Sequence, residues 1–236
     1  MRAAEKRKTV KTLARRARAG ADPPARVIDL ILYHLLHLHM PSAAAERSYA
    51  RLKCKYVDWN ELRVSSDLEI RRSVAVAPDA GDLVRRIKTL LNRIQSERSQ
   101  LSLEFLSDLN KGDARRYLRS LGLLSPATID LVLRQRKRDD VVPIDEHSER
   151  VLARTGLVPR RVSKTGIQKL LRRLVPEDRV LHFHRAVLDI AQRLCVRDEE
   201  AVKCPACPLR EVCAFGRSRC RAAQRNGRRR GVAKRA

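Results

Sequence analysis

The chain has 236 residues and a net charge of +25, because 52 Lys and Arg stand against 27 Asp and Glu. Its hydrophobic fraction of 43% suits a packed core and excludes wholesale disorder, whereas an aromatic fraction of 3% argues against an all-β domain and against stacking platforms for single strands. A charge of this size favours a polyanionic partner, most simply nucleic acid.

The positive charge is concentrated at the two ends of the chain. Residues 1–26 hold nine basic and two acidic residues, for a net +7, and residues 214–236 hold nine basic residues and no acidic ones, for a net +9. The middle keeps the remaining +9. We expect residues 214–236 to be a disordered basic tail that adds sequence-independent affinity for a polyanion.

Helical periodicity dominates, and hardly any segment alternates with a period of two, so the predicted fold class is all-α. The first two predicted helices are a basic amphipathic helix over 5–19 and a buried apolar helix over 27–40, which ends at Pro41. No apolar run reaches the ~20 residues of a membrane span. Further helices are expected over 43–55 with Ser42 as a cap, 68–76, 82–96, 102–109, 112–121, 126–136, 163–174 and 177–195.

The segment LRSLGLLSPATIDLVL, from Leu118 to Leu133, indicates a helix, a tight turn and a second helix. Ser125 is placed to cap the second helix, and Pro126 occupies its first turn. Such a hairpin can offer backbone N–H groups to a phosphate, although an ordinary hairpin in a core has the same pattern. Asp145 follows in VVPIDEHSERVLARTG, at the expected start of another helix, where an aspartate can cap the helix, serve chemistry, or both.

The cysteines are crowded near the C-terminus, which does not resemble a distributed disulfide framework, so we expect a reducing, intracellular compartment. The spacing C-x8-C-x2-C-x5-C is typical of thiolates that bind one metal centre. An iron–sulfur cluster is favoured over zinc because only one C-x2-C pair is present, and Cys220 is an alternative fourth ligand to Cys195. Cys54, isolated in a helix, is expected to be packed. The expected ligands are Cys195, Cys204, Cys207 and Cys213.

Taken in order, these features resemble the helix-hairpin-helix DNA glycosylases of the endonuclease III type. The cysteine loop is similar to that family's C-x6-C-x2-C-x5-C loop, lengthened by two residues, and Asp58 to Ser66 is similar to a segment of the plant 5-methylcytosine glycosylase branch. The resemblance covers about 5–213. The hairpin matches the pattern LPGVGxKTAxxVL at Leu121, Thr128, Val132 and Leu133. The next segment matches hVDTHhxRVxxRhG, where h is apolar, at Asp145, His147, Arg150, Val151, Arg154 and Gly156.

This resemblance implies a two-lobed fold: a six-helix barrel module over 27–143, and a cluster lobe over 144–213 on which the helix of the N-terminal segment 1–26 docks. It implies a DNA N-glycosylase of base-excision repair that acts as a monomer on double-stranded DNA, in the cytoplasm or nucleoid. The target base, damaged or modified, is flipped out of the stack before its glycosidic bond is cut. Asp145 would be the catalytic carboxylate, and the four cysteines would hold a [4Fe-4S] cluster.

Two departures from the family pattern bear on the activity. The lysine that forms a Schiff base in bifunctional members corresponds to Ala127, so we predict a monofunctional enzyme. The hairpin glycines correspond to Leu123 and Ser125, while Gly122 lies one position early. Three alternatives stay open: a bifunctional glycosylase/AP lyase, a catalytically silent DNA-binding member of the fold, and a zinc-stabilised nucleic-acid binder without glycosylase ancestry.

Alignment with the family also suggests DNA contacts. His39 occupies the position of the residue that fills the gap left by the flipped base, and nearby His34, His37 and Tyr33 either line a base pocket or are core side chains. In the cysteine loop, VRDEEAVK, the two basic residues would meet phosphates and the three acidic residues would repel them. The predicted DNA-binding residues are Gly122, Leu123, Ser125, Thr128, His39, Arg197 and Lys203.

Overall fold

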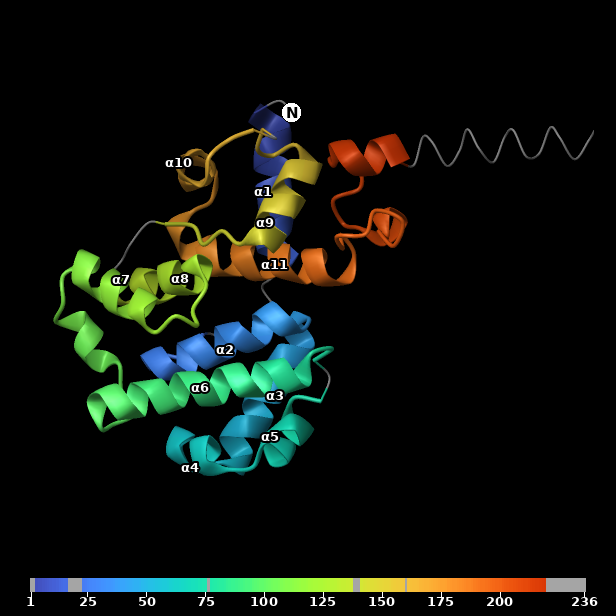
Figure 1. Ribbon diagram of the computed structural model, residues 1–236. Coiled ribbons are helices and arrows are strands. Elements are labelled where there is room, and N and C mark those ends of the chain that lie inside the picture. The colour runs from blue at the N-terminus through green and yellow to red at the C-terminus, as the bar shows by residue number, and fades with distance from the viewer. Residues whose placement is uncertain (1–2, 17–22, 76, 138–140, 160, 220–236) are drawn as a thin grey trace, which may run out of the picture. The chain divides into compact units, whose positions relative to one another are not determined.

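The computed structural model describes residues 3–16, 23–75, 77–137, 141–159 and 161–219 (Figure 1). Within these ranges the chain forms α-helices and short 3-10 helices and no strand, which confirms the predicted all-α class. The chain divides into two compact units, one of residues 19–145 and the other of residues 1–18 together with 146–236. No helix of the described residues has both the length and the apolar character needed to cross a bilayer.

The unit of residues 19–145 is built around helix α2, Val27–His39, which is buried from Val27 to His37. Helix α2 packs against α3, α6 and α8, so its nearly continuous apolar sequence contacts protein on several sides. The helices of this unit are α2 (Val27–His39), α3 (Ser42–Lys55), α4 (Trp59–Val64), α5 (Asp67–Ser73), α6 (Ala80–Arg98), α7 (Lys111–Ser120) and α8 (Pro126–Lys137), with the 3-10 helix η2 at Glu104–Ser107.

Helix α6 buries the apolar stripe that its amphipathic pattern predicts. Its apolar positions recur every three or four residues, and all five predicted stripe residues are fully buried while Arg and Lys lie on the other side. Each buried aliphatic side chain stabilises the fold by about 1.5–3 kcal/mol relative to exposure. The stripe consists of Leu83, Ile87, Leu90, Leu91 and Ile94.

The second unit joins the N-terminal helix to the C-terminal part of the chain. Helix α1 buries Val10 and Leu13, as the basic amphipathic pattern predicted, and it packs against α11 and α10. Helix α9 also packs against α11. The helices of this unit are α1 (Ala3–Arg16), α9 (Glu146–Thr155), α10 (Lys164–Leu174), α11 (Val180–Arg193), the 3-10 helices η3 (Glu177–Arg179) and η4 (Cys204–Ala206), and a short helix at 214–219.

Several local predictions were wrong. The sequence did not reveal α4, which begins after Asp58 because the Asp58 side chain accepts a hydrogen bond from the Glu61 N–H at 2.8 Å. Ser42 is the first helical residue of α3 and not its cap. The helix expected over 102–109 is only a four-residue 3-10 turn, η2. Cys54 is exposed on α3 and is therefore not a packed thiol.

The first six residues of the predicted disordered tail are helical. Residues 214–219, counted with the tail from sequence, form a helix, and the Arg154 guanidinium lies 4.8 Å from the centroid of the Phe215 ring. An aromatic side chain held by a cation gives this segment a reason to pack. Residues 220–236, including Cys220 as an alternative ligand, lie outside the described residues.

Candidate functional site

Asp145 occupies the predicted position directly before helix α9. It follows the buried residues Val142 and Ile144, and the aspartate itself is only 9% exposed. The first turn of a helix carries partial positive charge, so this is a favourable position for a carboxylate. The apolar run thus anchors the backbone in the core, and Asp145 comes directly before the positive end of α9.

The hairpin between α7 and α8 makes its turn at Gly122. The φ angle of Gly122 is +69°, a left-handed conformation that side chains with a Cβ rarely adopt. The Gly122 N–H donates to the Arg119 carbonyl at 2.9 Å, and Arg93 Nη1 donates to the Leu121 carbonyl at 3.3 Å. Gly122, which lies one position earlier than the glycine of the family pattern, therefore ends helix α7.

The start of α8 is organised by a chain of hydroxyl contacts that runs from the half-buried Ser125 into the core. Ser125 caps the helix as predicted, since its Oγ accepts from the Thr128 N–H at 3.1 Å. The same Oγ lies 2.9 Å from Thr128 Oγ1, which in turn lies 3.0 Å from His34 Nδ1 on α2. This relay of Ser125, Thr128 and His34 ties the hairpin to the central helix of its unit.

The four predicted hairpin contacts differ in accessibility. Gly122 is exposed, and Leu123 and Ser125 are half-buried, so all three retain surface for a ligand. Thr128 is 0% exposed, and its hydroxyl is already engaged by Ser125 and His34. Its side chain therefore has a structural role in the hairpin in place of the direct DNA contact that the sequence suggested.

We expect Thr128→Val to lower the free energy of unfolding by about 1–3 kcal/mol, because a methyl group would replace the hydroxyl that contacts the buried His34 and the half-buried Ser125. Thr128→Ser, which keeps the hydroxyl, should lose about 1 kcal/mol from the missing methyl group. Urea unfolding of both variants measures the difference. Equal stability of the wild type and the valine variant would show that the relay contributes nothing.

The histidines of α2 fall into two groups. His39, at the end of the helix, is half-buried, and its Nδ1 lies 2.6 Å from Asp79 Oδ2. Tyr33, His34 and His37 are buried, and the Tyr33 and His37 rings lie 4.3 Å apart between centroids. These three residues are core side chains of the unit, and only His39 offers a surface to a ligand.

The cysteine loop brings four thiols of the second unit near one another. Cys204 and Cys213 are buried, and Cys195 and Cys207 are partly buried. Burial, the largest cause, and the neighbouring thiols of Cys213, Cys195 and Cys204 together raise the pKa of the Cys207 thiol to about 11. The Gly216 N–H donates to Cys213 Sγ at 3.3 Å.

The four thiols are chemically suitable ligands for a metal centre, but their arrangement in this structure is not that of a metal site. Four cysteines with N–H donors to sulfur are the ligand environment of an iron–sulfur cluster. Among the described residues, however, no group of three or more His, Cys, Asp or Glu side chains is arranged to hold a metal ion. The ligand set therefore stays a prediction.

Two arginines of α9 hold this loop, a role that the sequence motifs did not predict. Arg150 Nε donates to the Cys195 carbonyl at 2.9 Å, and burial lowers the pKa of its guanidinium. Arg154 Nη1 donates to the Val196 carbonyl at 2.6 Å and lies 3.5 Å from Cys195 Sγ. Cys213 Sγ donates to the Arg154 carbonyl at 3.4 Å. Both ends of the loop are thus bound to one helix.

The two basic residues predicted to meet phosphates lie in the same loop. Arg197 forms an ion pair with Glu146, the first residue of α9, and its side chain is largely exposed. Lys203 is exposed, and its backbone N–H donates to the Leu194 carbonyl at 2.9 Å. Glu199 lies 3.6 Å from Arg154, so one of the three loop carboxylates has a cationic neighbour.

Comparison with known sequences finds distant relatives. No protein-family model matches the chain. The putative DNA glycosylase At3g47830 of Arabidopsis thaliana is 24% identical over 190 residues, which cover 78% of this chain and 65% of that protein. DEMETER-like protein 2 of Arabidopsis thaliana is 24% identical over 174 residues, which cover 66% of this chain and 13% of that protein. The chain therefore spans less than two thirds of these relatives.

Solved structures share the fold over nearly the whole chain. A non-covalent endonuclease III–DNA complex matches with a TM-score of 0.63 and 18% identity over 94% of this chain and 99% of that one. A trapped endonuclease III–DNA covalent intermediate gives a TM-score of 0.61 and 18% identity over 93% and 99%. A thermostable thymine-DNA glycosylase gives 0.57 and 16% over 91% and 98%. The resemblance predicted from the sequence motifs is thus confirmed, and the fold is that of the endonuclease III-type structures.

Proposed function

We propose that this chain, which has the endonuclease III-type fold, is a DNA N-glycosylase of base-excision repair that removes a damaged or modified base by hydrolysis. One observation carries the proposal: Asp145 is retained at the start of α9, whereas the lyase-lysine position on α8 is Ala127, which is 0% exposed. A methyl group in the core cannot attack a sugar, so the proposed activity is monofunctional.

The proposed reaction uses one carboxylate and one water. The glycosidic bond between C1′ and the base nitrogen breaks, and the base leaves with the bonding electron pair. The Asp145 carboxylate stabilises the positive charge that develops on the sugar and accepts a proton from the attacking water, whose oxygen bonds to C1′. The departing base takes up a proton from solvent, which leaves an abasic sugar.

The proposed substrate is double-stranded DNA, bound by a monomer in a reducing, intracellular compartment. Three observations support a DNA partner: the net charge of +25, the accessible residues of the hairpin turn, and the exposed Arg197 and Lys203 of the cysteine loop. Extraction of the base from the helical stack is required because the glycosidic bond is not accessible within it.

The test is a base-release screen on duplexes that carry different damaged or modified bases. We expect release of a base and an abasic site that is cleaved only after alkali treatment, with no protein–DNA adduct after borohydride reduction. A trapped adduct would establish the bifunctional alternative. Salt-sensitive binding without release from any duplex would establish the catalytically silent alternative, in which only the binding surface is retained.

We further propose that Cys195, Cys204, Cys207 and Cys213 hold a [4Fe-4S] cluster. The support is the four-thiol set in one loop, the N–H donor to Cys213 and the two arginines that fix the loop. When bound, the cluster would order the loop and take no part in bond cleavage. Anaerobically purified protein should contain about four iron and four sulfide per chain. One zinc per chain without sulfide would overturn the assignment.

A further inference from the structure

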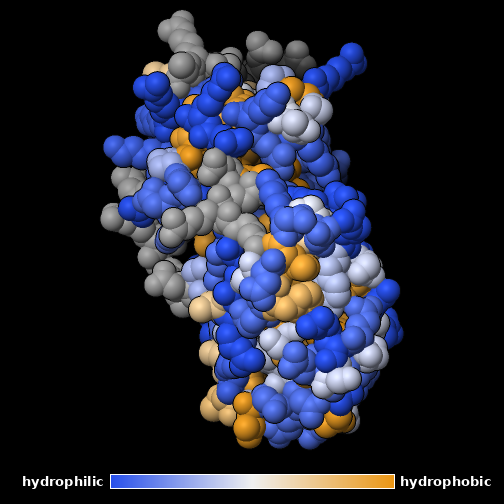
Figure 2. Space-filling view, turned by 90° about the vertical axis from the view of Figure 1, so that its left-hand side faces the viewer, coloured by the Kyte–Doolittle hydropathy of each residue, from blue (hydrophilic) through white to orange (hydrophobic). Residues whose placement is uncertain are grey.

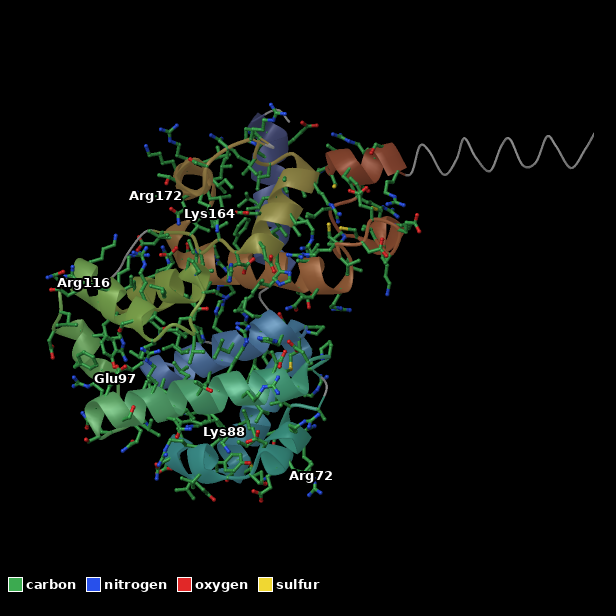
Figure 3. All side chains as sticks on the ribbon, viewed as in Figure 1. Arg72, Lys88, Glu97, Arg116, Lys164 and Arg172 are labelled. Carbon is green, nitrogen blue, oxygen red and sulfur yellow. The ribbon has the colours of Figure 1, made fainter. Side chains whose placement is uncertain are left out.

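Helix α10 exposes charged residues that are all basic, and none of the glycosylase motifs accounts for them. Residues 157–176 contain six basic residues and no acidic residue. Within the described part of this stretch, Ile167 and Leu171 are buried in the unit. The exposed residues of the helix include Lys164, Lys169, Arg172 and Arg173, which we call the α10 strip. Figure 3 labels Lys164 and Arg172 on this helix.

Other basic helices of the chain differ from α10 because their own sequences supply acids. On α6, Arg85 pairs with Asp82, and on α11, Arg193 pairs with Asp189 at 3.3 Å. On α7, Arg116 pairs with Asp113. Pairs at such spacing turn a basic helix into a solvated, mixed-charge surface. The sequence of α10 has no acid, and the ion pair that Lys164 forms with Glu149, at 3.7 Å, reaches to α9.

The positive surface continues on the neighbouring helix. Helix α1 packs against α10 within the same unit and exposes Arg7, Lys8 and Lys11. The view in Figure 2, from the side on which α10 lies in Figure 1, shows mainly hydrophilic residues among the coloured atoms of the upper part. A surface that is rich in exposed Lys and Arg binds a polyanion with little dependence on the sequence of that polyanion.

We propose that the α10 strip binds backbone phosphates of double-stranded DNA, outside the residues that the glycosylase motifs identify. The proposal rests on the proposed function, which makes DNA the polyanion that the protein must hold. Two members of the strip are arginines, whose guanidinium groups match phosphate oxygens with paired hydrogen bonds. Lys164 and Arg173 are nine residues apart, about 14 Å along a helix, which is long enough to follow several phosphates.

The experiment measures binding of the full-length protein to an undamaged DNA duplex over a range of salt concentrations. The test variant replaces Lys164, Lys169, Arg172 and Arg173 with Gln. The matched control replaces four exposed basic residues of α3 and α5, namely Arg51, Lys55, Arg71 and Arg72, with Gln. Both variants lose four charges, and melting curves verify that both remain folded.

Each phosphate contact contributes about −0.9 to the slope of log affinity against log salt. We expect the salt slope of the α10 variant to become shallower by about 2–3, and its affinity at low salt to fall by about tenfold or more. The salt slope of the control variant should change by less than about 0.9, the contribution of one phosphate contact. Equal slopes for the two variants would overturn the proposal.

Base release separates this proposal from the proposed function. In single-turnover reactions at saturating enzyme, the α10 variant should release the base at the wild-type rate, because the strip contributes binding and not chemistry. If the wild type releases no base from any duplex, the proposed function fails. The salt slopes still decide whether α10 contacts DNA.

Discussion

Asp145→Asn is expected to lower the rate of base release by about 10²- to 10⁴-fold, the range of a lost general acid or base. The substitution suits the site because asparagine is isosteric with aspartate and begins helices equally well. Asp145 directly precedes α9 and is 9% exposed, so a neutral amide can replace it without loss of packing. Single-turnover kinetics on the duplex that the wild type processes provides the measurement.

The control for this prediction is Glu146→Gln. Glu146 is the next residue along the chain, its side chain is exposed, and it pairs with Arg197. We expect nearly wild-type release from this variant, since a surface ion pair contributes about 0–1 kcal/mol. Undiminished release by Asp145→Asn would remove that residue from the catalytic role. An equal loss in both variants would point to the local backbone and not to the carboxylate at 145.

Arg154→Met is expected to lower the free energy of unfolding by about 2–5 kcal/mol and to reduce the iron bound per chain. The Arg154 side chain is 12% exposed, and its guanidinium donates to the carbonyls of Val196 and Arg197, at 2.6 and 3.1 Å. Methionine keeps much of the hydrophobic stem but leaves both carbonyls and the Glu199 carboxylate without the cation. Thermal unfolding and iron analysis report the two effects separately.

Arg193→Met is the matched control for Arg154→Met. Arg193 lies on α11 in the same unit, is 60% exposed and forms an i,i+4 pair with Asp189. Its replacement should cost less than about 1 kcal/mol and leave the iron content unchanged. If Arg154→Met melts like this control and binds as much iron, the arginine does not hold the cysteine loop.

Much of the fold could be predicted from the sequence because helical periodicity is a local signal. The buried helix α2, the stripe of α6 and the Ser125 cap of α8 all depend on residues within a few turns of one another. Helix α4 was missed because six residues are too few to show a period, and only the Asp58 cap marks its start.

The candidate site was predictable in its motifs but not in its connections. The sequence identified Asp145, the hairpin and the four cysteines. The contact between His34 and Thr128 joins residues 94 positions apart, and Arg150 reaches the Cys195 carbonyl across 45 positions. No pattern along the chain encodes such pairs, because they arise only when helices pack.

The sequence by itself determined the sign of this protein's charge, its helical class and its resemblance to glycosylases, since each depends on composition or on short motifs. Tertiary structure decided which groups remain available. Burial removed Thr128 from the surface, packing engaged Arg150 and Arg154 with the cysteine loop, and the docking of Ile167 and Leu171 turned the cations of α10 outward. The physical reason is that the solvent exposure of a residue depends on how the whole chain packs, whereas its charge depends only on the residue type.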